Sequence, residues 1–566
     1  MKVPSRNNLA LAAIFIITAI CLLSGWRLFW FLTDDAYISF RYVSNSILGY
    51  GYVWNPPPFR PVEGYTNFLW IVLLEAVWRI LKIQPPESST YISLFCSYLS
   101  LLVTTVFVMN MKLHDRLKPY RIIFVVIVLT GILTNRTFLA WTSSGLETAL
   151  YNLLVILWVY YCMFTYQVQA RRLAVISLIT LSIGLTRPDG MLFAAILAGT
   201  HIMAWLYNRK LFKLKELTGL TPLLGIGIHI LWRKNMYGEW LPNTYYAKIN
   251  SIWPESGIRY FSSFALEYSL WLWAVPFMLL GVKKAHSYLT NTTPAKETAG
   301  QTEKSRINLL YKFIALSALS LHAAYYTLIV GGDYFEFRIY SVFIPLILVS
   351  LLYSINLLSL NVRTAIAIMV LYILFSWPIQ WTGWNAARTN NSIPIDNHIY
   401  SQVGASLPRY LKWYGDIYDR QQNWLIDHFV CIRHQEHKNF YLYLKSVTPT
   451  RDDGQLLPAN DFPVLAISSP GVFGWAMPRI NIIDTLGLND YVVARNPVNK
   501  SNIRLMAHEH TAPAGYIQCF SPNVEPGPMP GKPVVVLRTK PLTANDIQNC
   551  EHQWSLKVQA ATQELL

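Results

Sequence analysis

Residues 9–42 read LALAAIFIITAICLLSGWRLFWFLTDDAYISFRY, and this stretch decides what kind of protein the chain forms. The apolar run 9–31 is long enough to cross the ~30 Å hydrocarbon core of a bilayer as a helix. It follows a basic amino terminus and lacks the small-residue cleavage site of a signal peptide, so we expect a retained first crossing with a cytoplasmic amino terminus. The run ends at Asp34 and Asp35, which are either capping residues of a helix at the membrane surface or a catalytic acid pair.

The composition indicates a polytopic α-helical membrane protein. Of the 566 residues, 53% are hydrophobic and 14% are charged, whereas a soluble domain carries roughly 25% charged residues. The net charge of +16 does not indicate a nucleic-acid partner, because Lys and Arg collect in short loops between apolar runs. That distribution follows the positive-inside rule.

The apolar runs predict about eleven membrane crossings at roughly 20 residues each. They lie near residues 9–31, 90–111, 122–139, 148–166, 173–187, 190–207, 217–233, 264–282, 308–330, 339–358 and 363–382. A further run at 65–83 is interrupted by Glu75 and Arg79 and is expected to be interfacial or re-entrant. With this assignment the basic loops 111–121, 169–172, 208–215 and 283–306 all face the cytoplasm, and the chain after residue 382 lies outside.

Two regions follow from this pattern. We expect residues 1–382 to form a transmembrane domain whose first external loop, about 32–66, contains the candidate acid pair, and residues 383–566 to form a C-terminal extracytoplasmic domain. In the second region, β-like runs at 462–469 and 532–539 alternate with turn signals, which predicts a mixed α/β fold. For its cysteines we expect Cys519 to pair with Cys550.

Polar segments at the helix ends all fall on the outer side in this topology. Their candidate functional side chains are Asp34, Asp35, Arg41, Glu63, Tyr65, Glu147, Arg187, Asp189, Asn243, Tyr245, Tyr246, Lys248, Asp333 and Arg338. Each also has a structural interpretation as a helix cap, a tight turn, an aromatic belt at the interface or a snorkelling anchor. Ionisable residues at membrane depth are functional by default, so their convergence on one face favours a cavity with a chemical role.

The helical spacing of the first segment adds a specific expectation. If residues 34–41 are helical, Asp34 and Arg41 share one stripe two turns apart. A guanidinium on that stripe would hold an anionic leaving group next to a carboxylate base. We therefore expect the phosphate of a substrate to lie within reach of Arg41.

Carboxylates and several cations, without a nucleotide-binding glycine loop, suit a phosphate-bearing substrate that arrives through the lipid. Lysine and arginine neutralise the departing phosphate, and one aspartate takes a proton from an acceptor hydroxyl. This chemistry is glycosyl transfer from a polyprenyl-phosphate sugar. The alternatives are a transporter or flippase of lipid-linked sugars, which favours midplane polar residues and repeat symmetry, and a structural or assembly protein.

Several motifs carry a resemblance to a known family. In chain order they are DDAYISFRYVSNSILGYGYVWNPP (34–57), RPVEGYTNFLW (60–70), GLETALY (145–151), TRPDG (186–190), LPNTYYAK (241–248), GGDYFEFR (331–338) and DTLGLNDYVVAR (484–495). Together they resemble bacterial GT-C membrane glycosyltransferases of the mycobacterial terminal β-(1→2)-arabinofuranosyltransferase type. The resemblance covers most of the membrane part and reaches residue 495.

The resemblance implies an inverting pentosyltransferase of the bacterial inner membrane. Its donor would be a polyprenyl-phosphate arabinofuranose, used on the periplasmic face, and its acceptor a glycan, a lipid-linked polysaccharide or a glycoprotein. The acidic pair of the first external loop maps onto Asp34 and Asp35 as the holders of the catalytic base. Asp484 and Asp490 either line an acceptor groove or cap a turn.

No metal site is predicted. In HEHT (508–511) the two histidines are spaced i,i+2 without a third ligand nearby, whereas a helical zinc pair is spaced i,i+4. A divalent cation on Asp34 or Asp35 stays an alternative, because some GT-C enzymes use one. No other cofactor is expected.

Overall fold

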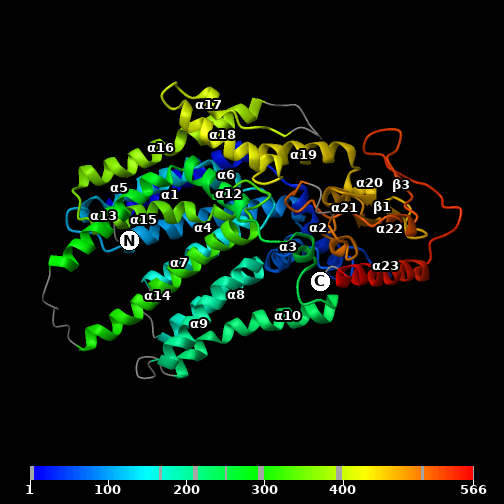
Figure 1. Cartoon of the computed structure of the whole chain (residues 1–566), viewed down its shortest axis with the longest axis horizontal. Coiled ribbons are helices and arrows are strands. Elements are labelled where there is room, and N and C mark those ends of the chain that lie inside the picture. The colour runs from blue at the N-terminus through cyan, green and yellow to red at the C-terminus, as the bar shows by residue number, and fades with distance from the viewer. Residues whose placement is uncertain are drawn as a thin grey trace.

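The computed structural model describes residues 6–164, 169–207, 214–248, 251–290, 299–389, 398–498 and 503–564. Helices dominate this part of the chain, and long apolar helices lie side by side across the left and centre of Figure 1. Short helices and strands of the C-terminal region gather at the right end. The protein is thus a helical membrane protein with its irregular elements at one end of the bundle.

Six segments of the described chain are long and apolar enough to cross a membrane. They are Leu9–Phe29 in α1 (Arg6–Phe29), α4 (Pro85–Asn110), Pro188–Tyr207 (η2, Pro188–Gly190, and α9, Met191–Tyr207), Ser305–Val330 (α14, Ala299–Ala324, and η4, Tyr325–Val330), Arg338–Leu357 (η5, Arg338–Tyr340, and α15, Phe343–Leu357) and Val362–Arg388 in α16 (Val362–Thr389). A seventh is the pair α12 (Pro254–Glu267) and α13 (Leu270–Thr290), which is bent by 87°. All seven coincide with predicted crossings.

The other predicted crossings fall on shorter or more polar helices. They are α5 (Arg121–Leu133), α7 (Thr148–Phe164), α8 (Gln169–Thr186) and α10 (Leu224–Tyr237), the last preceded by the 3₁₀ helix η3 (Leu214–Leu223). The 13 residues of α5 are about 20 Å long, which is less than the hydrocarbon thickness. Length and composition therefore support a smaller number of spans than eleven.

The ambiguous run 65–83 forms α3 (Phe68–Leu81), a helix of 14 residues. At about 21 Å it is too short to cross a bilayer, in agreement with the predicted interfacial or re-entrant position. Glu75 lies on its buried side, where it accepts hydrogen bonds from Ser46 (3.0 Å) and Arg79 (2.7 Å).

The remaining elements of the described chain are mostly short helices and strands. They are α2 (Asp34–Ile47), η1 (Lys118–Tyr120), α6 (Arg136–Ala140), α11 (Asn243–Lys248), α17 (Val403–Ser406), α18 (Lys412–Asp427), α19 (His434–Val447), α20 (Arg451–Gln455), β1 (Val464–Ile467), α21 (Pro470–Ala476), β2 (Asn481–Asp484), η6 (Val493–Arg495), α22 (Tyr516–Cys519), β3 (Val524–Glu525), β4 (Val534–Val535) and α23 (Ala544–Glu564). Strands β1 and β2 pair in parallel, and β3 pairs with β4 antiparallel.

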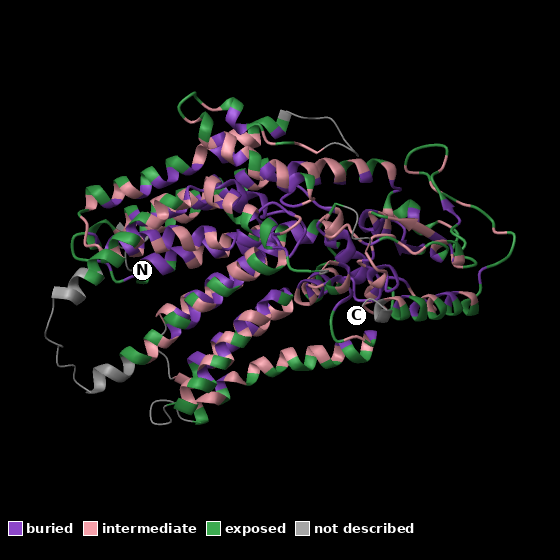
Figure 2. Ribbon diagram, viewed as in Figure 1, coloured by how far each residue is buried: buried purple, intermediate pink, exposed green. Residues whose placement is uncertain are grey.

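The first loop and the C-terminal region share hydrophobic cores. Phe59 and Val62 of the loop pack with Val464, Ile483 and Phe520 in one cluster. Figure 2 shows buried residues concentrated where the bundle meets the C-terminal elements. The C-terminal region is therefore built onto the loop that follows the first crossing.

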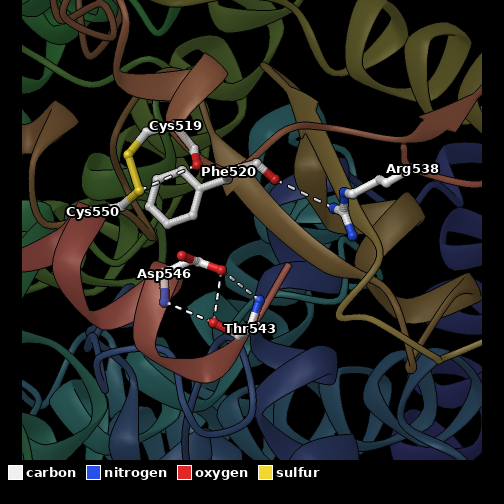
Figure 3. Close-up of a disulfide and its surroundings, with 6 residues drawn as sticks. All are labelled: Cys519, Phe520, Arg538, Thr543, Asp546 and Cys550. Atoms are coloured by element: carbon white, nitrogen blue, oxygen red, sulfur yellow. Dashed lines mark hydrogen bonds between the residues drawn. A yellow bond between two sulfur atoms is a disulfide. The ribbon is translucent and has the colours of Figure 1, made fainter. Parts of the chain in front are cut away.

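A disulfide bond joins α22 to α23 (Figure 3). It links Cys519 to Cys550, the pairing expected from the sequence, with 6.0 Å between the Cα atoms. Nearby, Thr543 and Asp546 exchange hydrogen bonds at the start of α23, and Arg538 donates to the carbonyl oxygen of Phe520 at 3.3 Å. The bond thus fastens the last helix to the core.

A fully buried charge network joins the bundle to α18 and α19. Arg136 donates to Glu336 at 3.0 Å and to Glu267 at 2.9 Å. Arg433 pairs with the same two carboxylates, and the hydroxyl group of Tyr418 donates to Glu267 at 2.5 Å. Two cations and two anions balance here, so removing one of them leaves an uncompensated buried charge.

We expect Arg136→Met to lower the free energy of unfolding by about 3–5 kcal/mol, because Glu267 and Glu336 would then share a single cation. The measurement is thermal unfolding of the purified protein. Lys412→Met is the control, since it breaks an exposed pair with Asp416 that contributes ~0–1 kcal/mol. Equal effects of the two substitutions would contradict a stabilising role for the network.

Candidate active site

Two cavities meet at the start of α2. The C-terminal cavity, of about 560 Å³, is walled mainly by residues of 398–508. The helix-end cavity, of about 280 Å³, is lined by the ends of α2, α8, α10 and η4 and by α11. Asp35, Lys248 and Tyr334 line both cavities.

Asp35 is the carboxylate at this junction. It lies in the first turn of α2, and within the described chain its side chain has no hydrogen bond and no ion pair. Successive residues of a helix point about 100° apart, so Asp34 and Asp35 face different surroundings. Asp35 is therefore the member of the pair that is free to act on a bound molecule.

Asp34 is committed to a structural contact. Its carboxylate accepts hydrogen bonds from the backbone N–H groups of Val472 at 2.7 Å and Gly471 at 3.2 Å, in the first turn of α21. Burial raises the pKa of Asp34 to about 7, while these two donors oppose the rise and the neighbouring Asp35 adds to it. Asp34 lines the C-terminal cavity, but its oxygens hold the end of a helix.

Arg41 lines neither cavity, so the expected phosphate contact is wrong. The side chain is fully buried and donates to the carbonyl oxygens of Trp54 (2.8 Å), Gly474 (2.7 Å) and Ile480 (2.8 Å) and to Asn55 Oδ1 (3.1 Å). Arg41 does share a helix stripe with Asp34, as predicted. The stripe faces α21 and its flanking loop, because these provide the acceptors that a buried guanidinium requires.

Most of the other predicted residues line the helix-end cavity. These are Tyr65, Glu147, Arg187, Asp189, Tyr245, Lys248, Asp333 and Arg338. The structure thus brings together polar helix ends from Tyr65 to Arg338 that are far apart in sequence.

The arginines of this cavity are already paired. Arg187 donates to Glu147 at 3.0 Å, to Asp189 at 3.0 Å and to the hydroxyl group of Tyr326 at 2.8 Å. Arg338 makes a bidentate pair with Asp333, at 2.7 and 3.0 Å. Each guanidinium has carboxylate partners, so its charge is largely balanced before any ligand binds.

Lys248 differs from both arginines. It is half-buried at the end of α11 and lines both cavities, and the structure describes no ion pair for its ammonium group. A third arginine of the helix-end cavity, Arg233, is paired with Glu63. Lys248 is therefore the cation best placed to receive an anionic ligand beside Asp35.

Glu63, Asn243 and Tyr246 lie outside both cavities and have structural roles. Glu63 is buried against Arg233. Asn243 donates to the carbonyl oxygens of Gly487 (2.8 Å), Leu488 (3.1 Å) and Asp490 (3.0 Å), and so fixes that turn. The ring of Tyr246 lies under the guanidinium of Arg495 at 3.9 Å. We correct their assignment as substrate-binding residues, because their polar groups are used within the protein.

Asp484 and Asp490 cap turns rather than line a groove. Asp484 accepts hydrogen bonds from the backbone of Leu486, Gly487 and Asn489 at 2.9–3.2 Å. Asp490 accepts from Val492 and Val493 and from the hydroxyl group of Tyr516 at 2.8–2.9 Å. Burial raises the pKa of Asp490 to about 6. Neither residue lines one of the two cavities, so the capping alternative is the correct one.

Sequence reasoning missed the histidines of the C-terminal cavity. His398, His437 and His508 all line it, as does Glu436, which accepts a hydrogen bond from His398 at 2.9 Å. His508 belongs to the HEHT motif, which was considered only for metal binding. The sequence offers no signal for this grouping, because His398, His437 and His508 lie far apart along the chain and meet only in the folded cavity.

No cluster of three or more metal-ligating side chains occurs in the described residues. No family model matches this sequence, and no similar chain is found among curated proteins. The geometry of the two cavities is therefore the main support for a function.

We expect Asp34→Asn to keep the shorter contact with α21, from Val472 N, because its amide oxygen also accepts a hydrogen bond, and to lose the longer one, from Gly471 N, because the amide NH2 group cannot accept. The pKa of Asp34 is raised to about 7 in the folded protein, whereas an unfolded aspartate titrates near ~3.9. The folded wild type therefore binds more protons between these values and loses stability as the pH rises through them. Its melting temperature relative to Asp34→Asn should fall from pH 5 to pH 8, and a flat or rising difference would contradict the buried position.

Proposed function

We propose that this protein is an inverting glycosyltransferase. It moves a sugar from a polyprenyl-phosphate donor to an acceptor of the cell envelope. The observation that carries the proposal is the unpartnered carboxylate of Asp35, which stands with Lys248 where two differently lined cavities meet. A base between two substrate spaces is what direct group transfer requires.

The helix-end cavity suits the lipid-phosphate donor. Besides Lys248 and the paired arginines, it has apolar lining from Leu185, Met191 and Ile226. On α10, which contributes Ile226, further apolar side chains such as Ile228 and Leu231 are exposed on the outside. A phosphate can thus be neutralised inside while its chain extends toward lipid.

The C-terminal cavity suits a hydroxyl-bearing acceptor. Its lining combines aromatic rings, among them Phe440 and Tyr443, with polar groups such as Asn439 and Ser468. In the transfer, the acceptor oxygen bonds to the anomeric carbon of the sugar as the bond to phosphate breaks. Asp35 takes the hydroxyl proton, and Lys248 stabilises the negative charge on the leaving polyprenyl phosphate.

The identity of the sugar rests on the motif resemblance alone. On that basis we propose arabinofuranose as the transferred sugar. A glycan, a lipid-linked polysaccharide or a glycoprotein remains the proposed class of acceptor.

We also propose that the cavity end of the bundle faces the periplasm, across the inner membrane of a bacterium. The basic loops place the opposite ends in the cytoplasm, although loops 208–215 and 283–306 lie partly outside the described residues. The Cys519–Cys550 bond supports the same side, because disulfides persist in oxidising compartments. Eleven crossings and a C-terminal extracytoplasmic domain of residues 383–566 belong to this proposal.

Asp35→Asn should lower kcat for sugar transfer by at least ~100-fold, because a general base contributes a factor of about 10²–10⁴ to the rate. Asp34→Asn is the matched control and should keep most of the activity. The assay uses membranes and a radiolabelled polyprenyl-phosphate sugar. Full transfer by Asp35→Asn would exclude the catalytic role. Movement of the donor across the bilayer by the wild type, without any sugar transfer, would favour the flippase alternative.

Lys248→Ala should lower kcat/KM for the donor about 10- to 100-fold, since one charge-assisted contact to a phosphate contributes roughly 1.5–3 kcal/mol. Lys248→Arg should recover part of the loss. Lys234→Ala is the control, because Lys234 donates to the carbonyl oxygen of Gly238 and is exposed. Equal activity of the two alanine variants would contradict the placement of the phosphate.

A further inference from the structure

Residues 407–414, which connect α17 to α18 and form the first turn of α18, lie against apolar helices of the bundle although they follow the last apolar run of the sequence. Val403 and Tyr418 are buried in one cluster with Ile379 of α16. Partly buried Leu266, Leu407 and Tyr414 pack against that cluster. Ile379 is within the apolar segment Val362–Arg388, so this piece of the C-terminal region reaches the level of a spanning helix.

Hydrogen bonds fix the same segment at the bend between α12 and α13. The indole N–H of Trp271 donates to the Tyr414 hydroxyl group at 3.2 Å, and that hydroxyl donates to the carbonyl oxygen of Leu266 at 2.6 Å. The bend of 87° means that α12 runs nearly across the direction of α13. If α13 follows the membrane normal, α12 and the α18 helix packed on it lie along the membrane surface.

The outward face of this segment is aromatic and basic. Tyr410 is 74% exposed, Trp413 is 62% exposed and Trp271 is 50% exposed. The indole N–H of Trp413 donates to the backbone carbonyl oxygen of Tyr410 at 3.1 Å, which fixes the indole ring against the start of the segment. Arg409 and Lys412 are also exposed there. Large exposed aromatics with a polar handle, next to cations, are typical of side chains in the headgroup layer of a bilayer.

We propose that Tyr410 and Trp413, together with Trp271, insert into the phospholipid headgroup layer at the cavity end of the bundle. The partner is lipid because the ring of Trp271 on α13 packs against Phe375 in the apolar segment of α16, and because the exposed Arg409 beside these rings complements lipid phosphates. The contact anchors α18 at a fixed depth. Tyr418 of the same helix donates to the buried Glu267 of α12, which joins α18 to the bundle.

This inference does not depend on sugar transfer. It concerns how the C-terminal region is seated, and it stands whether or not Asp35 is a catalytic base.

The test is photocrosslinking in native membranes that contain radiolabelled phospholipid. The full-length protein carries p-benzoylphenylalanine at Tyr410 or at Trp413, one position at a time. Phe375, exposed on α16, is the positive control, and Leu456, 81% exposed at the end of α20, is the negative control. Figure 1 places α20 at the end of the molecule away from the bundle.

Positions 410 and 413 should form lipid adducts at least five times more often than position 456 and within a few-fold of position 375. Lipid adducts no more frequent than at 456, with the adduct at 375 present, would overturn the proposal. Adducts to another protein in place of lipid would also overturn it. Because both side chains are exposed, the substitutions should leave the melting temperature unchanged, and each variant is checked for this before irradiation.

Discussion

The contact of α2 with both ends of α21 is the constraint on which the site depends. Asp34 accepts hydrogen bonds from the first N–H groups of α21, at 2.7 Å from Val472 N, and Arg41 donates to a carbonyl oxygen near its other end, at 2.7 Å from Gly474. In its ionised form Asp34 meets the positive end of the helix, and Arg41 meets the negative end. Because α21 connects β1 to β2, this contact holds the C-terminal region against the first loop.

One consequence is the orientation of Asp35. With Asp34 fixed on α21, the next residue of α2 must point elsewhere, and it points to the junction of the cavities. The walls of that junction come from distant parts of the chain. Asn243 holds the turn at Gly487, and Met506 and Ala507 line the helix-end cavity. The C-terminal region is thus part of the site and is not an appended binding module.

Site residues whose position follows from topology alone were predicted best. Glu147, Arg187, Lys248 and Asp333 were placed on one face by the basic loops, and they do line one cavity. The assignment of Arg41 failed for a different reason. Its helix stripe was correct, but its partner Gly474 is 433 positions away, and periodicity within a segment contains no information about such a distant contact. The histidines of the C-terminal cavity were missed for the same reason. Short helices such as α5 were counted as full crossings because the apolar run 122–139 is longer than the helix it contains.

In the proposed mechanism, phosphate and acceptor lie on opposite sides of Asp35, and a structure with a bound donor tests this most directly. The measurement is cryo-electron microscopy of the protein in nanodiscs with a non-transferable polyprenyl-phosphate sugar analogue. We expect the phosphate in the helix-end cavity within hydrogen-bonding distance of Lys248, with the anomeric carbon facing Asp35. A phosphate bound in the C-terminal cavity, or a sugar ring remote from Asp35, would contradict it.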